Sequence, residues 1–107
     1  MIKMVAFVKK RRELSREEFI RLWVEEHTKL SSILGMKGYR INVNLEPQPD
    51  GNRPPYDGSA EMWWEDEASM LAALSSEAGQ VAGADTERFA ESVEFAYTEE
   101  FVVLNGP

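Results

Sequence analysis

The sequence predicts a small α+β domain in which a four-stranded antiparallel sheet carries its helices on one face. Two observations support this fold class. Four segments have the composition of strands, and the clearest of them, residues 39–46, alternates apolar and polar side chains with the period of two that is typical of strands. Two segments of helical spacing separate them in the order β-α-β-β-α-β, a split β-α-β arrangement that places both helices on the same face. At 107 residues, the chain is expected to form a single domain over residues 1–107.

The first strand and the first helix are predicted from the N-terminal third of the chain. Residues 2–8 alternate and form the first strand. The helix is expected to begin after Ser15, because Glu18 follows at the spacing of a capping box, and to end at the glycine Gly35. The inward stripe of this helix is expected to consist of Phe19, Leu22, Trp23, His27, Leu30 and Leu34.

A proline-rich loop follows the second strand. Residues 39–46 alternate apolar and polar side chains and predict that strand. Residues 47–57 contain four prolines, which cannot donate ladder hydrogen bonds. This segment is therefore interpreted as a loop, which is either a flap over a site or only a long hairpin connection.

The third strand is predicted at residues 59–65. The alternation places Met62 and Trp64 on the face toward the helices, and Glu61 and Trp63 on the opposite face. A buried carboxylate needs a partner, so Glu61 is expected to pair with an arginine or an asparagine on its own face.

The C-terminal third predicts a second helical region and a last strand. Asp66 is a suitable N-cap for the helix, and Gly79 and Gly83 are expected to break it. A short helix is predicted at residues 86–92, and the last strand at residues 95–104. The second helix carries the apolar residues Met70, Leu71 and Leu74, and Phe89 of the short helix is expected to face inward.

The sheet face away from the helices is predicted to be apolar. Val5, Phe7 and Trp63 fall on it, and along residues 95–104 both faces carry apolar side chains. Each exposed Phe or Trp forgoes about 1.5–3 kcal/mol of burial, and contiguous patches of this kind are rare on monomers. Pairing of two copies about a twofold axis would hide both patches, so a homodimer is expected. The alternative is a monomer with a partly apolar sheet surface.

Composition restricts the function classes. The formal net charge of -7 argues against nucleic-acid binding, which requires a basic surface. The chain has no apolar run long enough to span a membrane, and its first residues lack the layout of a secretion signal. The absence of cysteine excludes disulfides, thiolate metal sites and a cysteine nucleophile. These features together predict a cytoplasmic protein.

One basic cluster interrupts the acidic composition. Residues 9–12, with the sequence KKRR, lie between the first strand and the first helix. Such a run is most often part of a solvated loop. The alternative is a contact with a phosphate or with an acidic partner.

The chain resembles the EthD family of the dimeric α+β barrel superfamily, whose members have ferredoxin-like folds. The resemblance rests on three stretches: residues 14–19 with Trp23, His27 and Leu30; residues 35–39; and residues 56–58 leading into 60–64, 72–76 and Gly79. Residues 99–103 resemble the closing strand of the family. The chain departs from the family at Thr28 and Lys29, where a small residue and a proline are common. The resemblance implies a small dimer with a hydrophobic pocket between the sheet and the helices of each subunit.

His27 and Tyr39 are the candidate catalytic residues. His27 is the only histidine, and an imidazole on the inward stripe can transfer a proton near neutral pH. The phenol of Tyr39 can stabilise an oxyanion. Both side chains have a purely structural alternative, as a hydrogen-bonded core histidine and a buried tyrosine. The candidate substrate-binding residues are Trp23, Met62 and Trp64, which are equally typical of a core.

Three functions remain open at this point. The first is a cofactor-free enzyme of the isomerase or cyclase type, acting on a carbonyl-bearing or aromatic metabolite. The second is a non-catalytic accessory protein that binds a small hydrophobic metabolite, and the third is a small cofactor-free monooxygenase. No metal site and no cofactor are expected, because one histidine and scattered carboxylates do not form a ligand set and no glycine-rich nucleotide loop is present.

Overall fold

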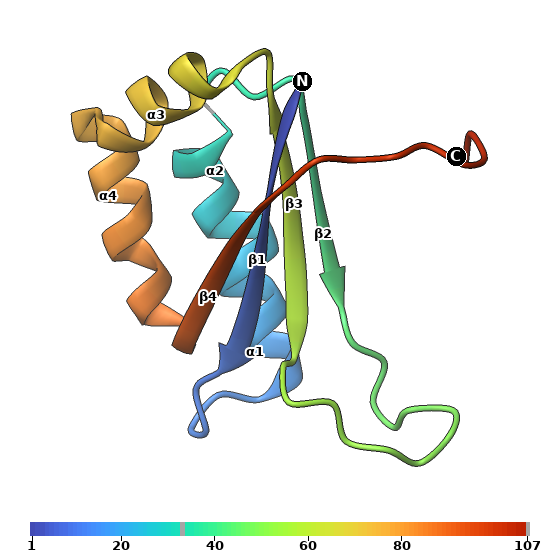
Figure 1. Cartoon of the computed structure of the whole chain (residues 1–107). Helices are drawn as coiled ribbons and strands as arrows, with labels where there is room; N and C mark the ends of the chain where they lie inside the picture. The colour runs from blue at the N-terminus through green and yellow to red at the C-terminus, as the bar shows by residue number, and fades with distance from the viewer. Residues whose placement is uncertain (33, 107) are drawn as a thin grey trace.

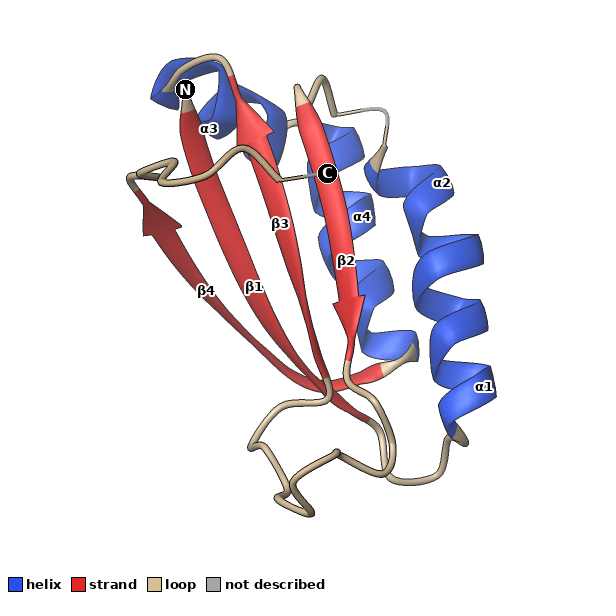
Figure 2. Cartoon of the chain, turned by 90° about the vertical axis from the view of Figure 1, so that its right-hand side faces the viewer, coloured by secondary structure: helices blue, strands red, loops and turns tan. Residues whose placement is uncertain are grey.

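The sheet forms one of the two layers of the structure, a computed structural model that describes residues 1–32 and 34–106. Its strand order over these residues is β2-β3-β1-β4, and each neighbouring pair is antiparallel. The strands are β1 (Ile2–Lys10), β2 (Gly38–Val43), β3 (Gly58–Trp64) and β4 (Ala90–Thr98). The helical elements are α1 (Arg16–Ile20), η1 (Arg21–His27), α2 (Thr28–Ser31), α3 (Glu67–Ser75), α4 (Glu77–Asp85) and η2 (Thr86–Arg88). The helices lie on one side of the sheet, which confirms the predicted fold class (Figures 1 and 2).

The first helical region is continuous from Arg16 to Ser31. Its predicted capping box is confirmed: the Glu18 amide donates to Ser15 Oγ at 3.1 Å, and the Ser15 amide donates to Glu18 Oε1 at 3.2 Å. The middle segment η1 is a π-helix, a form that often occurs at functional sites. The predicted end at Gly35 is too late, because α2 ends at Ser31, although Gly35 does adopt the left-handed backbone with φ 73°.

The second helical region differs from the prediction at its glycines. Asp66 is the N-cap of α3, as expected, but α4 continues through both Gly79 and Gly83. The two helices are separated at Ser76 instead, whose Oγ accepts from the Gly79 amide at 3.0 Å. A Cβ on Gly79 would lie 2.2 Å from the carbonyl oxygen of Ala73, so the glycine allows a close approach of the two helices. The short helix predicted at residues 86–92 is a 3-10 turn, η2.

The last strand lies earlier in the chain than predicted. β4 pairs with β1 from Ala90 opposite Lys10 to Thr98 opposite Lys3, and therefore ends where β1 begins. The apolar residues beyond it lie outside the sheet and are 65–88% exposed: Phe101, Val102, Val103 and Leu104. Figure 1 shows this C-terminal segment crossing the open face of the sheet and leaving the body of the protein.

The two faces of the central strands are as predicted. Ala6, Met62 and Trp64 are buried toward the helices, at 4%, 8% and 1% exposure. Phe7 and Trp63 lie on the opposite face, where Phe7 is 37% exposed. None of the helices within the described residues has the length and apolarity needed to cross a membrane.

Candidate functional site

A buried histidine and a half-buried aspartate from distant parts of the chain form a pair. His27 stands at the end of η1, and Asp85 at the end of α4. His27 Nδ1 lies 2.9 Å from Asp85 Oδ2, and the histidine is 6% exposed. The ring of Phe89 contacts the imidazole edge-on, with 5.2 Å between ring centroids. His27 was predictable from the sequence but Asp85 was not, because no local pattern connects positions that are 58 residues apart.

The environment of Asp85 determines which imidazole nitrogen carries the proton. Arg88 Nε donates to Asp85 Oδ1 at 2.6 Å, and Arg88 Nη1 also donates to Glu26 Oε1 at 3.0 Å. The Arg88 guanidinium, and secondarily His27, holds the pKa of Asp85 below its usual range. Asp85 is therefore ionised near neutral pH and can only accept hydrogen bonds. Nδ1 of His27 must donate to it, which leaves Nε2 as the basic nitrogen of the neutral ring.

Tyr39 is connected to the same helical region through a serine. Its hydroxyl lies 2.9 Å from Ser31 Oγ, and Ser31 Oγ donates to the carbonyl oxygen of His27 at 3.3 Å. Since the single serine proton is directed to that carbonyl, the Tyr39 hydroxyl is the donor to Ser31. Burial raises the pKa of Tyr39, so the phenol is protonated near neutral pH and remains a hydrogen-bond donor.

The three predicted substrate-binding residues lie in the packed layer between sheet and helices. Trp23 is 2% exposed and stacks on Phe89, with 5.8 Å between ring centroids. Trp64 donates through Nε1 to the carbonyl oxygen of Leu34 at 3.0 Å. Met62 is 8% exposed and lies opposite Tyr39 in the register of β2 and β3. A substrate pocket lined by these side chains stays a prediction.

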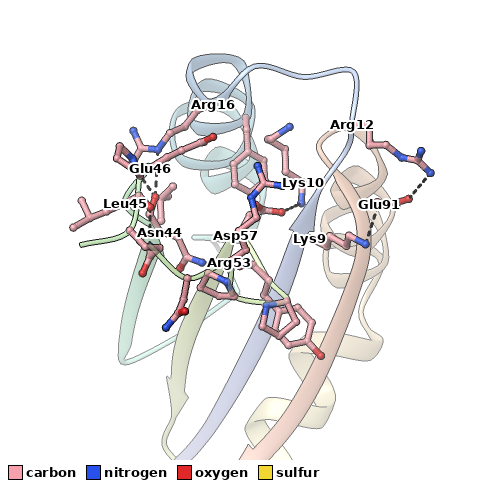
Figure 3. Close-up of a pocket in the computed structure, with 18 of the residues that line it drawn as sticks. Lys9, Lys10, Arg12, Arg16, Asn44, Leu45, Glu46, Arg53, Asp57 and Glu91 are labelled. Carbon is pink, nitrogen blue, oxygen red and sulfur yellow. Dashed lines mark hydrogen bonds and ion pairs between the residues drawn. The ribbon is translucent and has the colours of Figure 1, made fainter. Parts of the chain in front are cut away.

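Two cavities lie away from these residues. A cavity of about 750 Å³ lies where β1 ends, walled by α1 and by the loop between β2 and β3 (Figure 3). A smaller one of about 320 Å³ is lined by Leu30 from α2 and by Glu77, Ala78 and Val81 from α4. Neither cavity is lined by any of the predicted site residues His27, Tyr39, Trp23, Met62 and Trp64. Within the described residues, no group of three or more His, Asp or Glu is placed to hold a metal ion.

The ion pair with Arg88 is expected to set the acid stability of the Asp85 site. The pKa of Asp85 is lower in the folded protein than its ordinary value of 3.8. The carboxylate therefore contributes its full stabilisation at pH values above 3.8, and this contribution is lost as the pH falls through the pKa of the folded state. Changing Arg88 to glutamine is expected to raise the pKa of Asp85, and with it the pH at which this contribution disappears. An NMR titration that follows the Asp85 side-chain carboxyl carbon measures the shift directly.

Arg21→Gln is the matched control for this titration. Arg21 pairs with the same Glu26 carboxylate as Arg88 does, but it is not a partner of Asp85. The control is therefore expected to leave the Asp85 midpoint in place. Equal midpoints in the Arg88→Gln variant and the wild type would show that the guanidinium does not hold the carboxylate ionised.

Comparisons with solved structures show the same fold in other proteins. An ethyl tert-butyl ether D (EthD) family protein from Bacillus halodurans superimposes with a TM-score of 0.78 at 20% identity, covering 94% of this chain and 99% of that chain. A dimeric protein of unknown function and ferredoxin-like fold from Bacteroides fragilis has a TM-score of 0.66 at 13% identity, with 92% and 95% coverage. A hydroxynitrile lyase from Passiflora edulis has a TM-score of 0.74 at 12% identity, with 97% and 96% coverage.

The comparison of sequences identifies the family. No curated protein matches the chain. The EthD domain matches residues 11–92, a range that includes the His27–Asp85 pair, the helical elements, the strands β2 and β3 and the start of β4. The fold is the ferredoxin-like α+β fold seen in the structural neighbours. The chain therefore belongs to the EthD domain family.

Proposed function

We propose that the protein is a cofactor-free enzyme that moves a proton on a small carbonyl-bearing or aromatic metabolite, in a reaction of the isomerase or cyclase type. The observation that carries the proposal is the hydrogen bond between His27 Nδ1 and Asp85 Oδ2, at 2.9 Å in a buried site. An aspartate that orients a histidine in this way holds one tautomer and stabilises the imidazolium once it forms. A structural neighbour named as a lyase adds support for enzymatic chemistry on this fold.

In the proposed reaction, each side chain has a separate role. His27 Nε2 removes a proton from the carbon next to the substrate carbonyl, and the imidazolium returns it at another carbon. Asp85 offsets the positive charge of that imidazolium. The Tyr39 hydroxyl transfers its hydrogen bond from Ser31 to the substrate oxygen, where negative charge develops. Because His27 is 6% exposed, the substrate reaches the imidazole only if the surrounding layer opens.

A second candidate is a non-catalytic protein that binds a small hydrophobic metabolite. The low exposure of His27 and its hydrogen bond to Asp85 favour this alternative, since both suit a purely structural histidine. The two candidates differ in one respect: only the enzyme requires Nε2 to exchange protons with a bound molecule.

Hydrogen exchange on carbon distinguishes the two. We expect the protein in D₂O to catalyse deuterium uptake next to the carbonyl of at least one member of a panel of aliphatic aldehydes, aliphatic ketones and aryl alkyl ketones, followed by ¹H NMR. His27→Gln is expected to lower that rate by about 10²–10⁴-fold, the usual contribution of a general base. Asp85→Asn is also expected to lower it, because an amide can donate to Nδ1 and so favour the wrong tautomer.

The control for this experiment is Arg21→Gln, whose side chain is exposed and makes no contact with His27 or Asp85. It is expected to retain the wild-type rate, and circular dichroism verifies that each variant is folded. A rate that is unchanged in His27→Gln would contradict the enzymatic proposal. Saturable binding without exchange for the whole panel would favour the binding protein.

We further propose that the functional unit is a homodimer paired through the open face of the sheet. Structural neighbours described as dimeric support a homodimer. Val5, Phe7 and Trp63 supply the apolar surface of this face. One ion pair is already formed on this face, since Lys3 Nζ lies 2.6 Å from Glu61 Oε1, and burying a formed pair costs less than burying the two charges separately. The predicted asparagine partner of Glu61 is confirmed, because Asn42 donates to Glu61 Oε2 at 3.2 Å.

A further inference from the structure

The larger cavity is cationic, in contrast to the rest of the chain. Its volume of about 750 Å³ falls in the range of small-molecule sites, which is about 300–1,000 Å³. The basic side chains on its walls are Lys9, Lys10, Arg12, Arg16 and Arg53, and the acidic ones are Glu46, Asp57 and Glu91. The lining thus has a formal excess of two positive charges in a protein whose net charge is -7. Figure 3 shows these side chains arranged around the cavity.

Two of these cations are held by neutral groups. Arg16 donates from Nε and Nη2 to the carbonyl oxygen of Asn44, at 3.3 and 3.1 Å. Lys10 Nζ donates to the carbonyl oxygens of Leu14 at 2.6 Å and Arg11 at 3.1 Å. Bonds of this kind orient a cation without neutralising it. The positive charges of Arg16 and Lys10 therefore remain able to attract an anion.

The remaining basic groups are only weakly neutralised. Lys9 and Arg12 share a single carboxylate, that of Glu91, at 3.6 and 3.8 Å. Both side chains are largely exposed, at 52% and 90%, so these pairs stabilise little. Arg53 belongs to the loop on the other side of the cavity (Figure 3). Cations from β1, from α1 and from the loop thus meet around one space.

The loop that forms one wall is held in place by its own hydrogen bonds. The Asn44 amide donates to the carbonyl oxygen of Asp57 at 2.9 Å, and Asn44 Nδ2 donates to that of Tyr56 at 2.6 Å. Asp57 in turn accepts from the Lys10 amide at 2.7 Å through Oδ2, which joins the loop to the end of β1. A wall fixed before binding lowers the entropic cost of holding a ligand.

Part of the lining is apolar. Phe19, Val43, Leu45, Pro54 and Pro55 border the same cavity as the basic side chains. A ligand that fits both kinds of surface has an apolar body and an anionic group. Arginine, with its planar set of donors, suits a carboxylate or a phosphate in particular.

We propose that this cavity binds a small amphipathic anion, an apolar metabolite that bears a carboxylate or a phosphate group. Arg16 and Arg53 hold the anionic group, and the apolar side chains contact the rest of the molecule. The basic run at residues 9–12 then contributes Lys9, Lys10 and Arg12 to a binding site rather than to a solvated loop. The proposal is independent of the His27 site, since none of the residues proposed for catalysis lines this cavity.

Calorimetric titration of the full chain tests the proposal with four probes: inorganic phosphate, phenyl phosphate, phenylacetate and the neutral analogue phenylacetamide. Saturable binding is expected for phenyl phosphate or phenylacetate, and not for phenylacetamide. A preference between the two anions identifies the anionic group. Inorganic phosphate is expected to bind more weakly than phenyl phosphate, because it lacks the apolar body.

Two variants assign the binding to this cavity. Arg16→Gln and Arg53→Gln are each expected to weaken it by about tenfold or more, the effect of losing one charge-assisted hydrogen bond. Arg53 lies on an exposed loop, so its variant is informative even if Arg16→Gln folds poorly. Arg21→Gln removes the same charge from a position further along the same helical region that does not line the cavity, and it is expected to bind as the wild type does. Absence of saturable binding for both aromatic anions, or equal affinity in the Arg53→Gln and Arg21→Gln variants, would overturn the proposal.

Discussion

Replacing Phe89 with alanine is expected to lower the free energy of unfolding by about 3–5 kcal/mol, the usual cost of removing a large aromatic side chain from a packed core. Phe89 is 1% exposed and stands between η2 and β4. Its ring stacks on Trp23 and contacts the rings of Phe19 and His27. The distances between ring centroids are 5.8 Å to Trp23, 6.1 Å to Phe19 and 5.2 Å to His27. The alanine variant therefore leaves a cavity among three rings that cannot easily close over it.

Urea denaturation at a fixed protein concentration measures this loss. The matched control is Phe101→Ala, which removes the same ring from a position that is 77% exposed, and its effect is expected to stay within about 0.5 kcal/mol. A loss below about 1 kcal/mol for Phe89→Ala would mean that the layer between sheet and helices relaxes far more easily than its packing indicates.

Changing Phe7 to glutamate is expected to convert the proposed homodimer into monomers. Phe7 lies on the open face, packed against Tyr56 at 5.3 Å between ring centroids, and it stands opposite Glu94 in the register of β1 and β4. A glutamate at this position adds a second carboxylate beside Glu94. Both subunits of the dimer carry the substitution, so two new charges enter the interface. Since an unpaired buried charge costs about 3–5 kcal/mol, the dimer dissociation constant is expected to rise by at least about a hundredfold.

Sedimentation equilibrium of wild type and variant at micromolar concentration tests this expectation. The control is Leu71→Glu on α3, which places the same charge at an apolar position that is 51% exposed on the helical side. This control is expected to remain dimeric. A wild-type protein that sediments as a single subunit would contradict the dimer, and Phe7 would then be an apolar residue in contact with water.

The elements that depend on local chemistry were predictable from the sequence. The N-caps Ser15 and Asp66 act as expected, because a cap needs only its own side chain and the amides that follow it. The orientation of β3 was also predictable, since alternation along a strand places Met62 and Trp64 on one face and Glu61 on the other.

The predictions that were wrong concern segments whose structure depends on contacts between distant parts of the chain. Residues 99–104 have the composition of a strand, but β1 offers no partner beyond Lys3, and a strand without a partner leaves its backbone groups unpaired. Gly79 was interpreted as a helix breaker because local propensity penalises glycine. In the structure, its missing side chain admits the carbonyl oxygen of Ala73 from α3, so the glycine allows α3 and α4 to approach closely.

The sequence by itself determined the fold class, the two faces of the sheet and the inward position of His27, because each follows from a periodicity read along one segment. Only the tertiary structure decided that Asp85 and Arg88 complete the histidine site, and that Arg16 and Arg53 border one cavity with the basic run of β1. The physical reason is that hydrogen bonds and ion pairs act over a few ångströms in space. The residues that form them are brought together by the packing of helices on the sheet, which leaves no local pattern in the chain.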